Sequence, residues 1–155
     1  MIPYKLEHVL SFTGKGDAGT QPEIIGQVPE GLRIHFYLTG GTFEGPGLRG
    51  KVRPVGGDWV TIRRDGVAVL DVRMTFETDS GALIYMTYPG VIDFGHEGYE
   101  RFLRGEMPEV VQIRIAPRMS TAHPDLLWLN RLQFAGMGEY RPSLRETKYD
   151  IYALK

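Results

Sequence analysis

The strongest constraint on the fold is an alternation of polar and apolar residues that recurs along most of the chain. Successive side chains of a β-strand point to opposite faces, so a period of two residues is typical of strands. In the longest run, residues 67–78, Val72 and Phe76 fall on one face and Arg73 and Glu77 on the other. This run predicts a central strand with one apolar and one polar face.

Further runs of the same kind predict about nine or ten strands and little helix. Asp65-Gly66 and Asp79-Ser80-Gly81 supply turns on either side of the central strand. The 20 glycines and 10 prolines of the chain suit a fold with many turns. The predicted strands cover residues 4–12, 32–39, 48–54, 59–64, 67–78, 82–88, 111–115, 126–134 and 149–154.

One short helix is predicted between Gly98 and Gly105, and a loop between Gly14 and Pro22. No internal repeat or low-complexity linker divides the sequence, so residues 1–155 are predicted to form a single domain. A long antiparallel sheet removes its exposed edges by closing on itself. We therefore expect an all-β fold, a single antiparallel β-barrel that is lipocalin-like in shape, with a two-sheet sandwich as the alternative.

Charge and composition exclude several classes of function. The 18 lysines and arginines against 19 aspartates and glutamates give a net charge of −1, whereas nucleic-acid binders are normally basic. The chain has no cysteine, which excludes thiol catalysis and thiolate metal sites. It has no run of about 20 apolar residues that would span a bilayer. We expect a soluble, cytoplasmic protein that binds neither nucleic acid nor membrane.

Two patterns resemble ligand sites but lack essential parts. Residues 45–51 match the start of a phosphate-binding loop, but Val52 stands where a magnesium-binding Ser or Thr is needed. The strand predicted there also offers no helix N-terminus to the phosphates. None of the four histidines has a partner at the spacing of metal ligands. We therefore expect no metal and no cofactor, with a site built from His35, His123 and a carboxylate as the alternative.

The polar face of the central strand is the first chemical candidate. It forms either the solvated outside of the barrel or the lining of a cavity. In the second case Arg73 and Glu77 would pair and shift each other's proton affinities. A carboxylate in an apolar pocket is a natural general acid or base. On this interpretation Glu77 or Asp58 would move a proton while Arg73 stabilises developing negative charge.

Aromatic and amide side chains are candidate binding residues. Tyr85, Tyr88 and Trp128 are predicted on strands near turns and loops, where they would stack on a flat ligand. On a strand, Trp128 and Asn130 would face the same way and present a flat apolar surface beside an amide. An amide that satisfies backbone groups is the structural alternative. His123 lies just before this segment and is a further candidate.

A series of short motifs runs in order through nearly the whole chain. The motifs are Gly47-Leu48-Arg49-Gly50, Gly56-Gly57-Asp58-Trp59, Asp65-Gly66, Leu70-Asp71-Val72-Arg73, residues 78–85, Tyr88-Pro89-Gly90, Trp128-Leu129-Asn130, Gly136-Met137-Gly138 and Tyr149-Asp150-Ile151-Tyr152. Together they resemble the domain-of-unknown-function 3237 family. The resemblance implies a compact β-barrel, often oligomeric, from bacteria and fungi, with no agreed catalytic set. Some members of that family accompany pathways for aromatic or polyketide-like compounds, which implies a pocket for flat molecules.

Two functions of different classes follow. The first is a barrel that binds a small, partly aromatic or carbonyl-containing molecule without transforming it. The second is a cofactor-independent acid–base enzyme, a lyase, isomerase or cyclase, acting on an aromatic or polyketide-like substrate. A structural subunit whose apolar outer row forms an oligomer interface is a third. The expected partners are a small-molecule ligand and further copies of the chain in a homo-oligomer.

Overall fold

The computed structural model describes residues 1–16 and 21–155, so part of the loop predicted at 14–22 lies outside the described residues. One α-helix, α1 (Gly98–Leu103), and two short 3-10 helices, η1 (Pro124–Arg131) and η2 (Pro142–Leu144), accompany the strands. The strands are β1 (Leu6–Lys15), β2 (Glu23–Val28), β3 (Gly31–Tyr37), β4 (Gly40–Gly45), β5 (Leu48–Ile62), β6 (Val67–Thr78), β7 (Leu83–Asp93), β8 (Val111–Ile115), β9 (Arg118–Ser120), β10 (Gln133–Arg141) and β11 (Glu146–Leu154).

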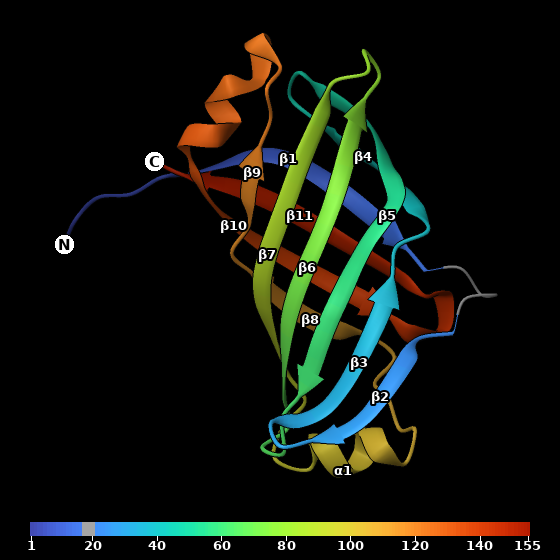
Figure 1. Ribbon diagram of the computed structural model, residues 1–155. Coiled ribbons are helices and arrows are strands. Elements are labelled where there is room, and N and C mark those ends of the chain that lie inside the picture. Colours follow the sequence, from blue (N-terminus) through green and yellow to red (C-terminus); the bar gives the residue numbers. More distant parts are fainter. Residues whose placement is uncertain (17–20) are drawn as a thin grey trace.

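The predicted antiparallel barrel is confirmed. Eight strands close on themselves in the order β5-β4-β1-β11-β10-β8-β7-β6, and pairing of β6 with β5 completes the ring (Figure 1). β3 and β2 extend the sheet from the second half of β5, and β9 pairs with one end of β7. Closure leaves no edge strand in the ring itself. Within the described residues, no helix is long and apolar enough to cross a membrane.

β5 is one long, bent strand where two strands were predicted. Its pairing with β6 shifts between Val52 and Gly56, so three residues in between have no partner on β6. Gly56 has a φ of 95°, and a Cβ there would lie 2.1 Å from the carbonyl oxygen of Arg73. The position requires glycine because only glycine combines this backbone conformation with so close an approach. The bend lets the first half of β5 pair with β4 and the second half with β3.

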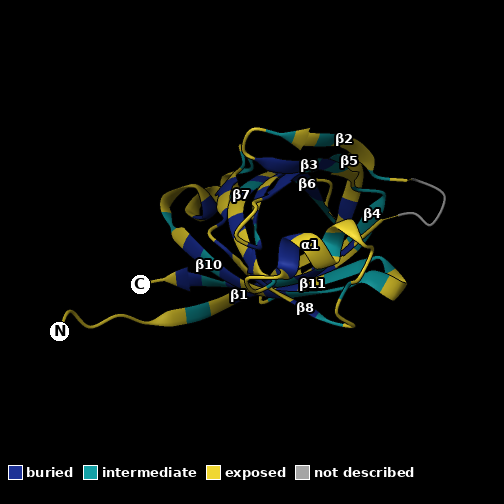
Figure 2. Ribbon diagram, turned by 90° about the horizontal axis from the view of Figure 1, so that it is seen from below, coloured by how far each residue is buried: buried dark blue, intermediate teal, exposed yellow. Residues whose placement is uncertain are grey.

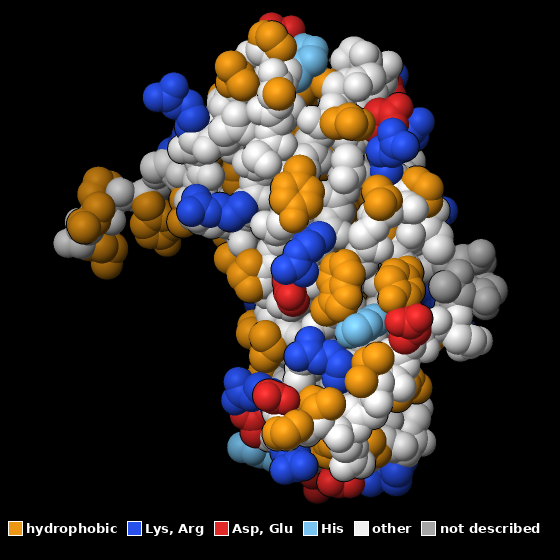
Figure 3. All heavy atoms as spheres, viewed as in Figure 1, with side chains coloured by type: hydrophobic (Ala, Val, Ile, Leu, Met, Phe, Trp, Pro, Cys, Tyr) orange, Lys and Arg blue, Asp and Glu red, His pale blue; other side chains and the backbone are white. Residues whose placement is uncertain are grey.

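The apolar row of the central strand points into the barrel. On β6, Val72, Met74 and Phe76 are all buried, with at most 4% of their surface exposed. Arg73 and Glu77 occupy the outer face, where they form ion pairs. Figure 3 shows charged groups scattered among apolar side chains over the outside of β5, β6 and β7. This orientation settles the central alternative left by the sequence, because burying the apolar row removes the larger nonpolar area from water.

The interior differs between the two ends of the barrel. At one end, Phe76 makes a stacked contact with Phe43 and an edge contact with Phe12, with ring centroids 4.8 and 5.4 Å apart. At the other end, α1 lies across the barrel opening (Figure 2), and Phe94 and Phe102 contribute side chains from α1 and its flank. The first end is filled by side chains, whereas a partly open cavity lies at the second.

Several local predictions were wrong. Residues 124–131 form the 3-10 helix η1 where a strand was predicted, with Leu129 fully buried. The alternation of Leu126 and Trp128 suggested a strand, but so short an apolar run is compatible with a strand or a helix. The strands β2, β4, β9 and most of β10 were not predicted, since glycine and polar residues interrupt their alternation. The short helix predicted between Gly98 and Gly105 is confirmed as α1.

Candidate functional site

The cavity at the α1 end of the barrel has a volume of about 340 Å³. Pockets for small ligands usually begin at about 300 Å³, so this one suits a compact molecule. Its wall is mostly aliphatic and aromatic. The lining side chains that matter below are Asp58, Leu70, Val72, Tyr88, Tyr140 and Tyr149, with Lys15 and Arg145 at the side where β1 ends and β11 begins.

Asp58 is the acidic residue of this cavity wall. It shares the inward face of β5 with Val60 and Ile62, because side chains two residues apart on a strand point the same way. Its Oδ1 accepts a hydrogen bond from the backbone N–H of Asp71 on β6, at 3.0 Å. One carboxyl oxygen is thereby held by the neighbouring strand. The remainder of the group borders the cavity.

Burial raises the pKa of Asp58 from 3.8 to about 7. The bond from the Asp71 N–H opposes this shift, since it favours the charged carboxylate, and the charge of Asp71 adds to it. A carboxyl group with this pKa exists in both protonation states near neutral pH. It can therefore act as acid or base under the same conditions.

Two tyrosine hydroxyls accompany Asp58. Tyr88 on β7 and Tyr149 on β11 come from strands that are separated by β8 and β10 in the ring, and their hydroxyls lie close enough for each to shift the pKa of the other. Their rings lie 5.8 Å apart, and both residues are at most 5% exposed. Burial raises the pKa of both phenols, and the charge of Asp58 raises it further. Both tyrosines therefore remain neutral donors at physiological pH.

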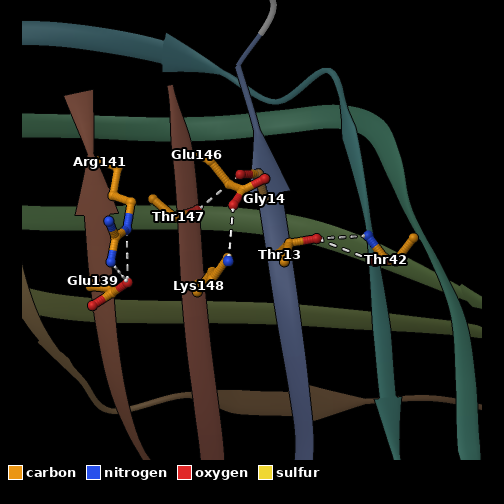
Figure 4. Close-up of polar contacts among 8 residues, drawn as sticks. All are labelled: Thr13, Gly14, Thr42, Glu139, Arg141, Glu146, Thr147 and Lys148. Carbon is orange, nitrogen blue, oxygen red and sulfur yellow. Dashed lines mark hydrogen bonds and ion pairs between the residues drawn. The ribbon is translucent and has the colours of Figure 1, made fainter. Parts of the chain in front are cut away.

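The wall near Lys15 and Arg145 is built from the ends of β1, β10 and β11. Thr147 points inward and donates a hydrogen bond to the carbonyl of Gly14, while Lys148 points outward to Glu146 (Figure 4). Arg145 has a φ of 48°, which makes it the one residue other than glycine with a positive φ among the described residues. Burial raises the pKa of Tyr140, and the charge of Arg145 opposes this rise only in part. Lys15 and Arg145 therefore place two cationic side chains at this side of the cavity.

The structure separates Glu77 and Arg73 from the cavity. The carboxylate of Glu77 forms ion pairs with Lys51 Nζ at 3.2 Å and Arg53 Nη1 at 2.9 Å, on the outside of the barrel. Arg73 pairs with Asp71 at 3.1 Å and lies over the ring of Trp59. The expected pairing of Arg73 with Glu77 is therefore not formed. Of the three predicted catalytic residues, only Asp58 borders the cavity.

The predicted binding residues are also divided. Tyr88 lines the cavity, whereas Tyr85 on the same strand points outward and is 45% exposed. Trp128 lies on the surface of η1. The Asn130 side chain accepts a hydrogen bond from Thr121 N at 2.8 Å and donates one to Thr121 O at 2.9 Å, which is the structural alternative foreseen for it.

His123 precedes η1, and its buried Nδ1 has no hydrogen-bond partner among the described residues. It does not line the cavity. No group of three or more histidines and carboxylates within residues 1–16 and 21–155 is arranged to hold a metal ion. The sequence resembling a phosphate-binding loop forms the tight turn between β4 and β5 and the first residues of β5, and no helix follows it.

Tyr149 is the site residue that sequence reasoning missed. Its alternation with Ile151 on the last strand reads as ordinary core, and both residues are indeed buried. Nothing local marks a buried tyrosine as a polar group of a site. Tyr88 lies much earlier in the sequence, and only barrel closure brings the two hydroxyls together.

Comparison with known proteins places this chain in a family. The model of the family described as "Protein of unknown function (DUF3237)" matches residues 4–154. A UPF0311 protein of Rhodopseudomonas palustris is 34% identical over 113 residues, covering 72% of this chain and 74% of the relative. A UPF0311 protein of Bradyrhizobium diazoefficiens is 32% identical over 126 residues, covering 79% and 80%.

Solved structures share the whole fold. A β-barrel-like protein of Acinetobacter baumannii superposes with a TM-score of 0.83 at 30% identity, covering 100% of this chain and 98% of the other. A protein described as an enzyme from Penicillium herquei has a TM-score of 0.69 at 21% identity, covering 100% and 97%, and supports the fold alone. The family match over residues 4–154, together with these relatives, shows that the chain is a member of the DUF3237 family.

Proposed function

We propose that this protein binds a small, partly aromatic or carbonyl-containing molecule in the cavity of its barrel and that Asp58 exchanges a proton with that molecule. The observation that carries the proposal is the position of Asp58, a carboxyl group with a pKa of about 7 in a cavity of about 340 Å³. An active site is where burial and charge are used to bring a carboxyl pKa close to the working pH.

The lining supports a ligand of this class. Leu70, Val72 and their neighbours offer apolar contacts, while Asp58 and the two tyrosines offer a few polar groups. Small-molecule sites combine a mostly apolar wall with a small number of polar groups that set orientation. A flat molecule with one or two oxygen atoms satisfies both parts of this wall.

The lining of the cavity also bears on whether the bound molecule is transformed. Binding without turnover is the second candidate, and the predominance of apolar lining favours it. Proton exchange is favoured by the raised pKa of Asp58. A purely apolar ligand would offer no hydrogen-bond partner to this buried carboxyl group, which is unfavourable.

The test uses 2-naphthol as probe and isothermal titration calorimetry in buffers of different ionisation enthalpy near pH 7. We expect binding by the wild type, with a heat that depends on the buffer, because a hydroxyl placed beside Asp58 changes the protonation of the carboxyl. Asp58→Asn should remove the buffer dependence. Glu77→Gln, which removes a carboxyl from the outer face, is the matched control and should retain it.

A cavity-filling variant locates the ligand. Leu70→Trp should lower the affinity for 2-naphthol at least about tenfold, because the indole occupies the space of the probe. Far-ultraviolet circular dichroism and a thermal melt check that this variant is folded. Unchanged affinity in a folded Leu70→Trp protein would place the probe outside the cavity and refute the proposal.

A further inference from the structure

The hydroxyls of Tyr88 and Tyr149 form a pair whose protons can be counted. Each phenol carries one proton and can accept hydrogen bonds on its oxygen. The two hydroxyls interact, and even when one turns its proton towards the oxygen of the other, the second proton is left over. Within the described residues, neither hydroxyl donates a hydrogen bond to another part of the protein, although both residues are almost completely buried. One donor of the pair is therefore available to a molecule in the cavity, which both residues line.

The pair is held rigidly by its surroundings. The ring of Tyr149 stacks on Phe12 with centroids 4.7 Å apart and an interplanar angle of 17°. Tyr88 lies in the middle of β7, where it pairs with Val72 of β6. A donor fixed in this way needs little reorganisation when charge develops on an oxygen in front of it.

Asp58 faces the same space from another part of the wall. Val72 lies opposite both Asp58 on β5 and Tyr88 on β7, so the three residues form one level across adjacent strands. The charge of Asp58 acts on both phenols, which agrees with this closeness. The cavity thus presents a proton acceptor and a separate hydrogen-bond donor to one bound molecule.

We propose that the substrates are enolisable carbonyl compounds, whose oxygen accepts a hydrogen bond from the Tyr88–Tyr149 pair while Asp58 carries the proton. This inference rests on the proposed function of the cavity and names the substrate class for it. The tyrosine that donates touches the reacting oxygen, and the other tyrosine is a positioning residue that orients it.

The chemical step is a balanced proton transfer. The ionised Asp58 takes a proton from the carbon beside the carbonyl, and the C–H bonding pair becomes the C=C bond of an enolate. The carbonyl π pair moves to the oxygen, where the tyrosine hydroxyl stabilises the negative charge. Asp58 then returns the proton to the same carbon or to another carbon of the conjugated system. The second outcome is an isomerisation, and no oxidant or reductant takes part.

The main experiment measures exchange of the α-protons of 2-tetralone for deuterium in D2O by proton NMR. The wild type should accelerate exchange over buffer, and Asp58→Asn should lower kcat by about a hundredfold or more. Tyr149→Phe and Tyr88→Phe should each lower kcat by about tenfold or more and change KM much less, because the hydrogen bond strengthens as the enolate forms. Tyr85→Phe removes an exposed hydroxyl from the same strand as Tyr88 and should match the wild type.

A second readout separates hydrogen bonding from a packing role. Substituted phenols imitate the enolate, so their affinity for the wild type should vary systematically with phenol pKa. The slope of that dependence should become shallower in Tyr149→Phe, whereas a loss of packing alone would lower all affinities equally and leave the slope unchanged.

The outcomes distinguish this inference from the proposed function. Exchange that requires Asp58 but is unaffected by both tyrosine variants overturns the inference and leaves the proposed function standing. Phenol binding that Leu70→Trp blocks, without any exchange of 2-tetralone by the wild type, also overturns the inference alone. If neither probe responds to Leu70→Trp or Asp58→Asn, both proposals fail.

Discussion

The two halves of β6 lie in the same barrel, yet they meet different interiors. Met74 and Phe76 enter a filled core with aromatic rings stacked around them, whereas Leu70 and Val72 border the cavity. All four side chains are buried and alternate in the same way. The comparison teaches that burial alone does not identify a core position, because a side chain can be shielded from water and still have no neighbour on one side.

The largest expected effect is a difference in unfolding free energy between substitutions in the filled half and in the cavity half of β6. Phe76→Ala should lower the free energy of unfolding by about 3–5 kcal/mol, since it removes a ring packed on all sides. Leu70→Ala should cost about 2 kcal/mol, at the low end for such a change, because part of its surface already faces empty space. Urea unfolding measures both. Equal losses after both substitutions would mean that the cavity half is as tightly packed as the filled half.

The next effect is a pH dependence confined to the hollow half. The folded pKa of Asp58 is about 7 and its ordinary value is 3.8, so the folded protein favours the protonated carboxyl. The contribution of this group is therefore most favourable below about pH 4 and is lost as the pH rises towards about 7. A difference of about three pKa units corresponds to roughly 4 kcal/mol at most.

The matched variants isolate that effect. Asp58→Asn keeps an acceptor for the Asp71 N–H but cannot ionise, so its stability relative to the wild type should increase between about pH 4 and pH 7 and level off at higher pH. Urea unfolding at several pH values checks this, and Glu77→Gln controls for the loss of one acidic group. Parallel stability curves for Asp58→Asn and the wild type would show that Asp58 does not titrate in this window.

A smaller effect tests the tyrosine pair at the border between the halves. Tyr88→Phe should destabilise the protein by about 1 kcal/mol, because it removes a buried hydroxyl that interacts with Tyr149. Tyr85→Phe should change the stability by less than about 0.5 kcal/mol, since its exposed hydroxyl is solvated in both states. Thermal unfolding of the two variants side by side gives the difference. Indistinguishable variants would argue against a stabilising interaction between the two hydroxyls.

The smallest effect is expected on the outer face. Glu77→Gln removes the ion pairs with Lys51 and Arg53, both of which are largely exposed. Exposed ion pairs contribute about 0.2–1 kcal/mol, and salt screens them. Urea unfolding with and without about 0.5 M sodium chloride measures this effect, because salt at this concentration screens charges that are more than a few Å apart. The free energy of unfolding should fall by less than about 1 kcal/mol, and the loss should be smaller in salt. A larger, salt-independent loss would mean that Glu77 has a role beyond surface pairing.

The alternation in residues 67–78 determined a great deal about this protein without any structure. It predicted the central strand, its two faces and the barrel class, because the period of two is a local property of extended backbone. The same local reasoning failed at Trp128 and Asn130, where a short apolar run was compatible with both a strand and a 3-10 helix.

Tertiary structure alone decided which face of β6 is inside, that Glu77 and Arg73 belong to the outside, and that Tyr149 belongs with Tyr88 and Asp58. Alternation divides a strand into two faces but does not say which encloses a cavity, since that depends on the strands that close the ring. The pairing of the two tyrosines joins β7 and β11 across the barrel, and the raised pKa of Asp58 follows from burial that this closure creates. Barrel closure is therefore the step that turns three separate residues of the sequence into one candidate site.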